Sequence, residues 1–293
     1  MKPAPFEYHA PESLAEALEL KREHGDEAKC LAGGQSLIPS MNFRLLQPAR
    51  LIDLNRLSQL DYIRVESDEL RIGAMTRQRR VEREAAVRER APLVAETMPW
   101  IAHPQIRNRG TFGGSLAHAD PAAELPVVAL AVNARFRAQS STADRWLAAR
   151  EFFQGSFTTA LQPDEILVEV ALPPLPPRTG TAFTEVARRR GDYAMAGVAV
   201  AVTLDEAGSC REATLVLLNV GDGPVDARQA SAALIGAKPT LAAIAEAAQL
   251  AAEKEIEPFG SVHATPAYQR HLAGVLARRA LRTAFERAGA RLG

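Results

Sequence analysis

Cysteine is scarce in this 293-residue chain, which contains only Cys30 and Cys210. An iron–sulfur cluster requires about four protein ligands, usually cysteines. The chain therefore excludes a cysteine-ligated cluster of its own. Two cysteines far apart in the sequence also fit a reducing cytoplasm better than a disulfide-stabilised secreted domain.

Net charge and long apolar segments are missing as well. The 35 Lys and Arg residues balance the 35 Asp and Glu residues, so no overall field favours nucleic acid or an anionic membrane. No uncharged apolar run approaches the roughly 20 residues of a membrane span. The first residues also lack the apolar core of a signal peptide. We expect a soluble cytoplasmic protein whose length suits two domains.

Familiar catalytic motifs are absent too. We find no Ser-His-Asp order, no pair of histidines at metal-binding spacing and no phosphate-binding Walker sequence. The G-x-G-x-x-G turn of a conventional dinucleotide-binding fold is also lacking. The sequence thus predicts no catalytic nucleophile, no general base and no metal ligand.

Two glycine-rich segments are the most informative feature that is present. They read Ala32-Gly33-Gly34-Gln35-Ser36 and Thr111-Phe112-Gly113-Gly114-Ser115. Adjacent glycines allow positive φ and close approach of a ligand to the backbone, and successive free N–H groups form a nest for phosphate oxygens. A single Gly-Gly pair is usually just a turn. Two matched pairs suggest that the two segments bind one long anionic ligand from opposite sides. A dinucleotide whose pyrophosphate binds to main-chain N–H groups is such a ligand.

The N-terminal half alternates between short strands and helices. Ser13 and Glu16 predict a capping box for a helix that ends at Gly25. Further predicted elements are a strand at 28–31, a helical turn at 41–46, strands at 50–54, 62–65 and 69–74, and helices at 76–90 and 125–132. The alternation predicts small α/β units.

The C-terminal half contains a proline-rich boundary. Residues 166–172 alternate as a strand with one buried side, and 172–177 form a stiff, extended linker. We predict a hairpin from strands at 198–204 and 213–220, then helices at 228–235, 241–254 and 266–288. The predicted units are 1–57 and 58–177, which together form one domain, and 178–293.

The phrases around both glycine-rich segments resemble one protein family. Residues 29–39 and 106–125 are similar to the two FAD-binding loops in the FAD-binding (medium) subunit of molybdenum hydroxylases, the xanthine dehydrogenase and carbon monoxide dehydrogenase family. The likeness continues at 152–155, 161–167, 188–194, 268–272 and 278–281. Phe112 stands where the family usually has Ile or Leu, and Ser115 where Asn is frequent. Neither departure removes a backbone donor.

The resemblance implies an α+β fold and non-covalent FAD. The fold would be a two-subdomain FAD-binding domain of the PCMH or vanillyl-alcohol-oxidase type, followed by a C-terminal domain of antiparallel strands and a helical bundle. The residues that it implies at the cofactor are Lys29, Ala32, Gly33, Gly34, Gln35, Ser36, Leu37, Ile101, Ala102, Thr111, Gly113, Gly114, Ser115, Ala117, Asp120, Glu124, Leu167 and Tyr193.

A few of these residues have competing interpretations. Asp120 is expected to accept from FAD hydroxyls, although Asp120-Pro121 is also a good helix N-cap and N1 pair. Tyr193 is expected on or beside the isoalloxazine ring, because aromatic faces stack on flat conjugated ligands; the alternative is an edge-strand tyrosine. His118 is a neighbour of the cofactor without a covalent bond. The roles of His103, Arg107, Arg109 and Arg188 stay open, and the arginines are candidates for a basic surface near the flavin.

The implied function is electron transfer within a heterotrimer. A large subunit with molybdopterin would oxidise the substrate, a small subunit with two [2Fe–2S] clusters would relay electrons, and this chain would pass them from FAD to an external acceptor. The assembly would be a dimer of heterotrimers, with peripheral attachment to the inner membrane face left open. The alternatives are a stand-alone FAD-dependent oxidase or reductase and a non-enzymatic nucleotide-binding or assembly protein. The substrate lies on another polypeptide and stays open.

Overall fold

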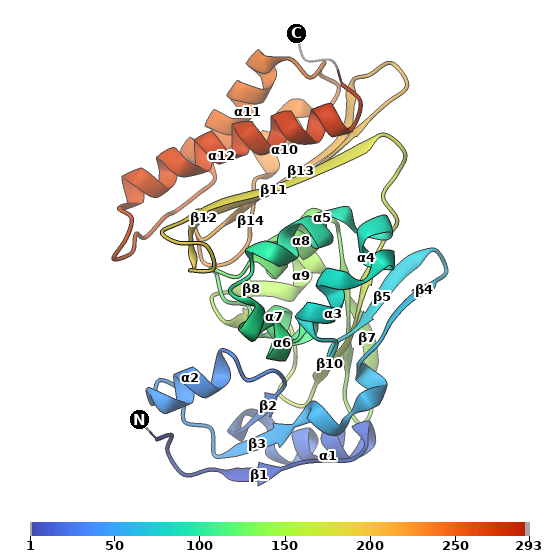
Figure 1. Cartoon of the computed structure of the whole chain (residues 1–293), viewed down its shortest axis with the longest axis vertical. Helices are drawn as coiled ribbons and strands as arrows, with labels where there is room; N and C mark the ends of the chain where they lie inside the picture. Colours follow the sequence, from blue (N-terminus) through green and yellow to red (C-terminus); the bar gives the residue numbers. More distant parts are fainter. Residues whose placement is uncertain (1, 291–293) are drawn as a thin grey trace.

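A computed structural model describes residues 2–290, which form three parts stacked along the long axis (Figure 1). The first part is a parallel sheet in the order β1 (Glu7–His9), β3 (Arg50–Asp53) and β2 (Ala28–Leu31). Helix α1 (Leu14–His24) packs against β3. The predicted strands at 28–31 and 50–54 are confirmed, whereas β1 was not predicted.

The predicted start of α1 is confirmed in part. Ser13 Oγ accepts the Glu16 N–H at 3.2 Å, as in a capping box. The Glu16 carboxylate, however, accepts from Glu12 N at 2.9 Å. Gly25 ends the helix at φ 48°, a backbone conformation that favours glycine.

The helical turn that we predicted at 41–46 is misplaced. Helix α2 spans Leu37–Asn42 and begins directly after the first glycine-rich segment. Pro39 lies in its first turn, where a missing N–H costs no helical hydrogen bond. The helix ends before Arg44, whose φ is 57°. The prediction placed the start of the helix four residues too late, because a proline in the first turn is compatible with a helix start at Leu37.

The second part contains a five-stranded antiparallel sheet. Its strand order is β4 (Ile63–Glu66), β5 (Glu69–Gly73), β10 (Ile166–Leu172), β6 (Arg135–Gln139) and β7 (Asp144–Ala148). β4 and β5 were predicted, but β6 and β7 were not. A small sheet of β8 (Phe153–Gly155) and β9 (Thr158–Thr159) lies beside it.

The prediction that residues 166–172 bury only one side is wrong. All seven residues of β10 are buried, because β10 is the central strand. Ile166 and Val168 belong to the core of the first part. Val170 and Leu172 belong to the core of the second part. The sheet is therefore shared between two hydrophobic cores.

Short helices cover this sheet. They are α3 (Gln78–Arg83), α4 (Ala85–Arg90), α5 (Pro92–Thr97), α6 (Pro104–Arg109), α7 (Phe112–His118), α8 (Glu124–Ala131) and α9 (Ala149–Phe152). Single 3-10 turns lie at Gly25–Glu27, Leu54–Arg56 and Ser58–Leu60, before this sheet begins, and at Met98–Trp100. The predicted helix at 76–90 is interrupted, because Glu84 has extended backbone angles of φ −68° and ψ 128°.

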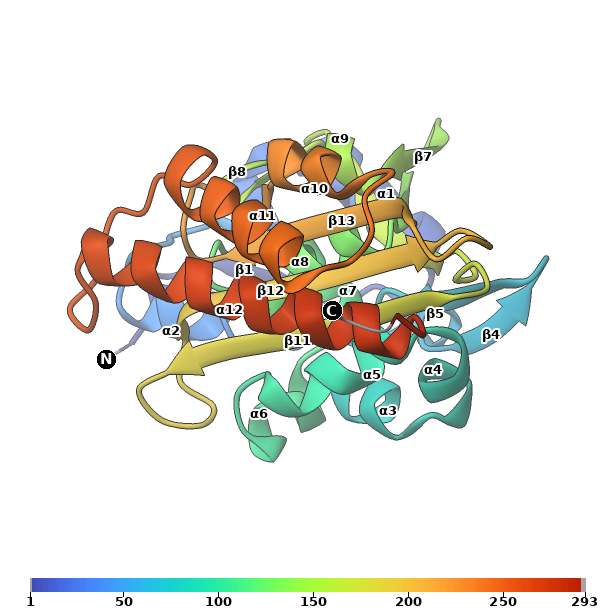
Figure 2. The same ribbon diagram turned by 90° about the horizontal axis from the view of Figure 1, so that it is seen from above.

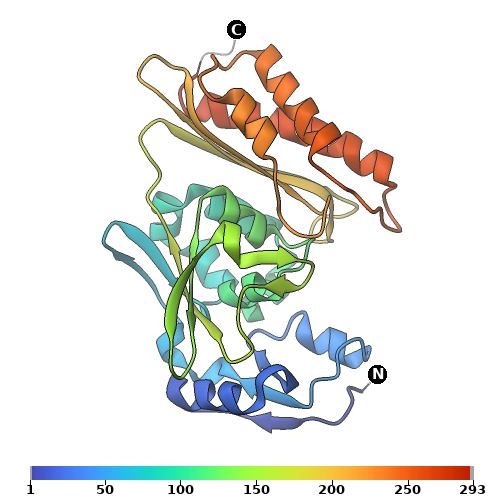
Figure 3. The same cartoon turned by 180° about the vertical axis from the view of Figure 1, so that it is seen from behind.

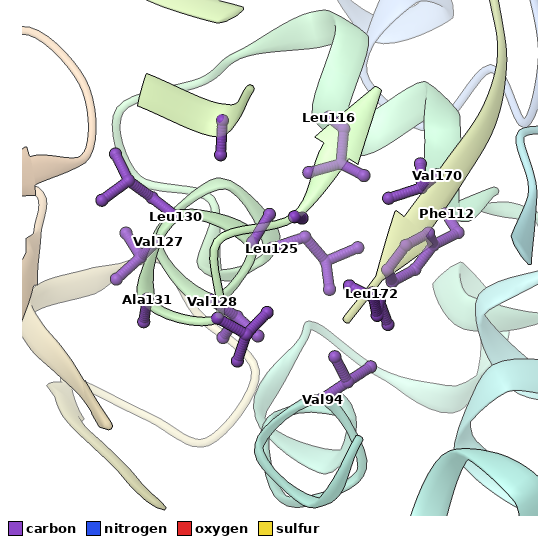
Figure 4. Packing of buried hydrophobic residues seen from close by; sticks show 14 of the residues in the cluster. Val94, Phe112, Leu116, Leu125, Val127, Val128, Leu130, Ala131, Val170 and Leu172 are labelled. Atoms are coloured by element: carbon purple, nitrogen blue, oxygen red, sulfur yellow. The ribbon is translucent and has the colours of Figure 1, made fainter. Parts of the chain in front are cut away.

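Helix α8 occupies the centre of the second part. All eight of its residues are buried, which is typical of a helix that is hydrophobic all round. Figure 4 shows Leu125, Val127, Val128 and Leu130 projecting from α8 in different directions, with Val94 of α5 beneath them. This helix therefore fixes the segment that precedes it, which carries Asp120.

The third part is an antiparallel sheet and a layer of helices. The sheet order is β11 (Thr179–Ala187), β12 (Ala194–Leu204), β13 (Cys210–Leu218) and β14 (Val225–Asp226). Helices α10 (Arg228–Leu234), α11 (Leu241–Lys254) and α12 (Pro266–Arg287) cover its outer face (Figure 2). The predicted hairpin and the three helices are confirmed. β11 was not predicted.

The inner face of this sheet packs on the second part. Phe183, Ala199, Val216 and Leu218 share a core with α5 and α8, whereas the alternate residues pack against α10–α12. Residues 173–178 connect β10 to β11 along one side of the molecule (Figure 3). Within residues 2–290, no helix combines the length and the apolar character needed to cross a membrane.

Candidate functional site

The first glycine-rich segment forms a row of unused backbone donors. Between β2 and α2, the N–H groups of Gly33 to Leu37 have no acceptor within residues 2–290. Gly34 has φ 71°. The Gln35 side chain donates to Gly33 O at 3.1 Å, and this hydrogen bond stabilises the turn. Buried or half-buried backbone donors normally have partners. A row without any is suited to bind the oxygens of an anionic ligand.

The second glycine-rich segment has a different structure from the expected loop. Thr111 is the N-cap of α7, and both Gly113 and Gly114 lie inside that helix. Gly113 N donates to Ala74 O at 2.9 Å, and Gly114 N donates to Thr111 Oγ1 at 3.0 Å. The expectation of a second nest of free N–H groups is therefore wrong. The sequence pattern did not reveal the Thr111 cap, which converts the segment into a helix start.

The absent Cβ atoms let the two segments touch. A Cβ at Gly33 would overlap Arg109 O and lie 2.7 Å from Gly110 Cα. A Cβ at Gly114 would lie 3.3 Å from that of Ala32. Glycine is thus required at these positions mainly because it allows close packing between the first and second parts. Positive φ is a minor reason, since only Gly34 of the four glycines adopts it.

A pocket of about 400 Å³ opens beside this contact. The residues that line it come from the end of β2, the first segment, α2, the end of β3, the 3-10 turn at Leu54–Arg56 and α6: Leu31, Ala32, Gly33, Gly34, Gln35, Ile38, Pro39, Asn42, Asp53, Asn55 and Arg109. The volume is within the range of small-molecule sites, about 300–1,000 Å³. Gly33, Gly34 and Gln35 of the unused N–H row therefore border a region with room for a ligand.

Arg77 and Asn55 hold the two segments together, and neither residue was predicted. Arg77 Nη2 donates to Asn55 Oδ1 at 2.6 Å, and its Nη1 donates to Arg109 O. Asn55 Nδ2 donates in turn to Ala32 O at 2.9 Å. Their roles depend on pairing across three elements, and nothing in the local sequence signals this.

Arg107 supports the neighbouring segment of Ile101 and Ala102. Its Nη1 donates to Ile101 O at 2.7 Å and to Ala102 O at 3.1 Å, while Nε donates to Glu82 at 3.0 Å. Arg107 is only 5% exposed. It is therefore a positioning residue for this backbone and not part of a basic surface, which answers the role that the sequence left open for it. Ala102 has the unusual φ of 45° for a residue with a side chain.

The connection between β11 and β12 reaches this same backbone. A Cβ at Gly191, where φ is 86°, would lie 3.0 Å from Ala102 O. Tyr193 follows and is 67% exposed. It is thus an accessible aromatic ring that lies two positions after Gly191 and just before β12 begins, rather than a residue of the strand edge. Arg188, Arg189 and Arg190 are exposed in the same connection.

Acidic residues gather between α7 and α8. The Asp120 carboxylate accepts from Ala122 N at 2.9 Å and so caps a turn. The N-cap of α8 is Ala123, so the alternative in which Asp120 and Pro121 are the N-cap and first residue of that helix is wrong. Burial raises the pKa of Glu124 to about 7. Partial burial and then the charges of Asp120 and Glu124 raise the pKa of Tyr193, so these three groups lie within electrostatic reach of one another.

The remaining predicted residues differ in accessibility. Ser36, Leu37, Ser115 and Ala117 are half-buried around the two segments. His118, also half-buried, has its pKa lowered by burial, and its ring lies 5.1 Å from that of Phe157. Lys29 is exposed on β2, Leu167 is buried in β10, and neither lines the pocket. Within residues 2–290, no group of three or more His, Cys, Asp or Glu side chains is arranged to hold a metal ion.

Comparison with known families matches almost the whole chain. Residues 4–175 match the FAD binding domain in molybdopterin dehydrogenase. Residues 181–284 match the CO dehydrogenase flavoprotein C-terminal domain.

Individual proteins are similar over comparable lengths. The 6-hydroxypseudooxynicotine dehydrogenase complex subunit alpha of Paenarthrobacter nicotinovorans is 42% identical, over 98% of this chain and 97% of the relative. Caffeine dehydrogenase subunit beta of a Pseudomonas species is 43% identical, over 77% and 76%. The structure of carbon monoxide dehydrogenase from Hydrogenophaga pseudoflava superposes with a TM-score of 0.94 at 39% identity, covering 98% of this chain and 99% of that one.

Proposed function

The chain belongs to the family of FAD-binding medium subunits of molybdenum hydroxylases, and we propose that it transfers electrons from an iron–sulfur partner through FAD to an external acceptor. The observation that carries the proposal is the row of unused N–H groups from Gly33 to Leu37 beside a pocket. These donors fit a pyrophosphate, the part of FAD that requires them. At the second segment, the lack of Cβ atoms at Gly33 and Gly114 lets the first and second parts of the protein approach closely.

We propose that different groups of the protein contact different parts of FAD. The N–H row of the first segment binds the pyrophosphate, while Thr111, Gly113 and Gly114 supply shape rather than donors. The full proposed set is Lys29, Ala32, Gly33, Gly34, Gln35, Ser36, Leu37, Ile101, Ala102, Thr111, Gly113, Gly114, Ser115, Ala117, Asp120, Glu124, Leu167 and Tyr193.

Asp120 and Tyr193 have distinct roles in this proposal. Asp120 is half-buried and keeps acceptor capacity beyond its bond from Ala122 N, which suits a sugar or ribityl hydroxyl. Tyr193 presents an exposed ring within electrostatic reach of Asp120 and Glu124, which suits a flat conjugated system. FAD, when bound, supplies the capacity to store electrons and release them. The protein orients it and sets its electrostatic surroundings.

The partners in this proposal follow from the family. A large subunit with molybdopterin oxidises the substrate, and a small subunit with two [2Fe–2S] clusters relays the electrons. We further propose the domain units 1–57, 58–177 and 178–293, a dimer of heterotrimers and a cytoplasmic location for the complex. The relatives named for nicotine-derived and caffeine substrates support an N-heteroaromatic or related small organic substrate on the large subunit.

Reconstitution tests the proposal. The chain is purified alone and also co-expressed with the [2Fe–2S] and molybdopterin subunits, and the oxidised-flavin absorbance is followed anaerobically after substrate addition. We expect bleaching in the assembled complex alone. Bleaching of the isolated chain by an organic substrate at ordinary enzyme rates, on the order of 1–1,000 per second, would replace the heterotrimer with a stand-alone oxidase.

A further inference from the structure

Arg109 combines a fixed main chain with a free side chain at the edge of the candidate site. It is the last residue of α6, on the side of the second part that faces the first (Figure 1). Arg109 O lies where a Cβ of Gly33 would be, and it accepts a hydrogen bond from Arg77 Nη1. Of the described residues that line the pocket, Arg109 alone is positively charged. Its place beside the first glycine-rich segment is therefore set by contacts that leave its guanidinium unused.

The guanidinium of Arg109 forms neither an ion pair nor a hydrogen bond within residues 2–290, and the residue is exposed. The carboxylate that lines the same pocket is Asp53, which is already bonded to other donors. The hydroxyl of Tyr8 donates to its Oδ2 at 2.5 Å, and Asn55 N donates to its Oδ1 at 2.9 Å. The five N–H donors of the Arg109 side chain are thus available to a ligand.

Arg77 indicates how near this free charge lies to the pocket wall. Burial and then the charge of Arg109 lower the pKa of Arg77, so the two guanidinium groups lie within electrostatic reach of each other. The Nη atoms of Arg77 are engaged by Asn55, which lines the pocket, and by Arg109 O. Arg77 therefore holds the two segments together, whereas Arg109 keeps its charge for what enters the pocket.

We propose that the Arg109 guanidinium binds the pyrophosphate of FAD together with the N–H row of Gly33 to Leu37. The inference rests on the proposed function, in which that row binds the same pyrophosphate. Backbone N–H groups supply only partial positive charges to an anion. A guanidinium adds a full charge and donates two parallel hydrogen bonds to phosphate oxygens. Because the row belongs to the first part of the protein and Arg109 to the second, the bound pyrophosphate joins the two parts.

The test is a titration of FAD into apoprotein of the full chain at low and at high salt. At about 0.01 M salt the Debye length is about 30 Å, and at about 1 M it is about 3 Å. Arg109→Met keeps the apolar stem without the charge, and Arg109→Lys keeps the charge without the planar fork. The matched control is Arg83→Met, an exposed arginine of α3 that does not line the pocket. Thermal unfolding of each apoprotein shows whether a substitution disturbs the fold.

The proposal predicts that Arg109→Met weakens FAD affinity roughly tenfold at low salt. This is near the lower end for a hydrogen bond between charged groups, because the arginine is exposed. The loss should shrink at high salt, Arg109→Lys should recover part of the affinity, and the control should bind FAD as the wild type does. Wild-type affinity in Arg109→Met, or a loss of equal size at both salt concentrations, overturns this inference alone. Wild-type apoprotein that binds no FAD overturns the proposed function together with the inference.

Discussion

Replacing Gly33 with alanine tests whether close contact between the two glycine-rich segments supports FAD binding. The added Cβ would overlap Arg109 O and lie 2.7 Å from Gly110 Cα, whereas carbon atoms pack best at about 3.5–4.0 Å. The two segments must therefore separate by roughly 1 Å. Because packing at this contact joins the first and second parts of the protein, the pocket between them changes shape.

The magnitude follows from the cost of overpacking. An extra methyl group in a tight contact costs about 1–3 kcal/mol. The apoprotein relieves this overlap by separating the segments, and FAD binding has to reverse the separation. If the whole cost falls on the bound state, FAD affinity weakens by about 5- to 150-fold, since 1.4 kcal/mol corresponds to a factor of ten.

The assay is a fluorescence titration of apoprotein with FAD, combined with thermal unfolding. Gly223→Ala is the matched control, because a Cβ at Gly223 meets nothing within 4 Å. We expect weak binding for Gly33→Ala and wild-type binding for the control. Equal affinity in all three proteins would refute the idea that this contact shapes the FAD site.

Three further predictions examine other parts of the account. Arg77→Met and Asn55→Ala should each weaken FAD binding in the titration. The double variant should lose less binding free energy than the sum of the two single losses, because both residues act through one hydrogen-bonded chain to Ala32. Additive losses would contradict this. Tyr193→Ala should alter the flavin spectrum or potential while the melting temperature stays unchanged, and an unaltered spectrum would remove Tyr193 from the cofactor. Arg107→Met should destabilise the protein by roughly 3–5 kcal/mol, as expected when one partner of a buried pair is removed. Burial by itself would raise the pKa of Glu82, but the hydrogen bonds and charges of Arg107 and Arg79 together lower it. Wild-type stability should therefore fall as the pH drops through that lowered pKa, and chemical denaturation at several pH values should show a smaller acid loss in the variant.

The sequence predicted the elements whose signals are local. The Ser13 cap and Gly25 stop define α1, and the Asp205–Gly208 turn defines the β12–β13 hairpin. Strand β10 was placed correctly, but its burial was not, since a central strand between two cores cannot be distinguished by alternation alone. β6, β7 and β11 were missed because their charged and threonine residues hide the period of a strand.

The candidate site was predicted only in outline. Matched glycine pairs drew attention to both segments, yet only the first has free N–H groups. In the second, the Thr111 hydroxyl and Ala74 O take up the donors, which requires knowledge of what packs on the segment. Asn55 and Arg77 act through partners more than ten positions away in the sequence. No local pattern indicates such pairings.

Acid release of flavin from the purified chain tests the central claim most directly. The protein is precipitated with acid, and the flavin in the supernatant is identified and counted against the polypeptide by chromatography and mass spectrometry. The account predicts one FAD per chain in the supernatant and an unmodified polypeptide mass. Flavin that stays on the polypeptide would contradict non-covalent binding, and a chain purified without any flavin that also fails to bind added FAD would contradict the function itself.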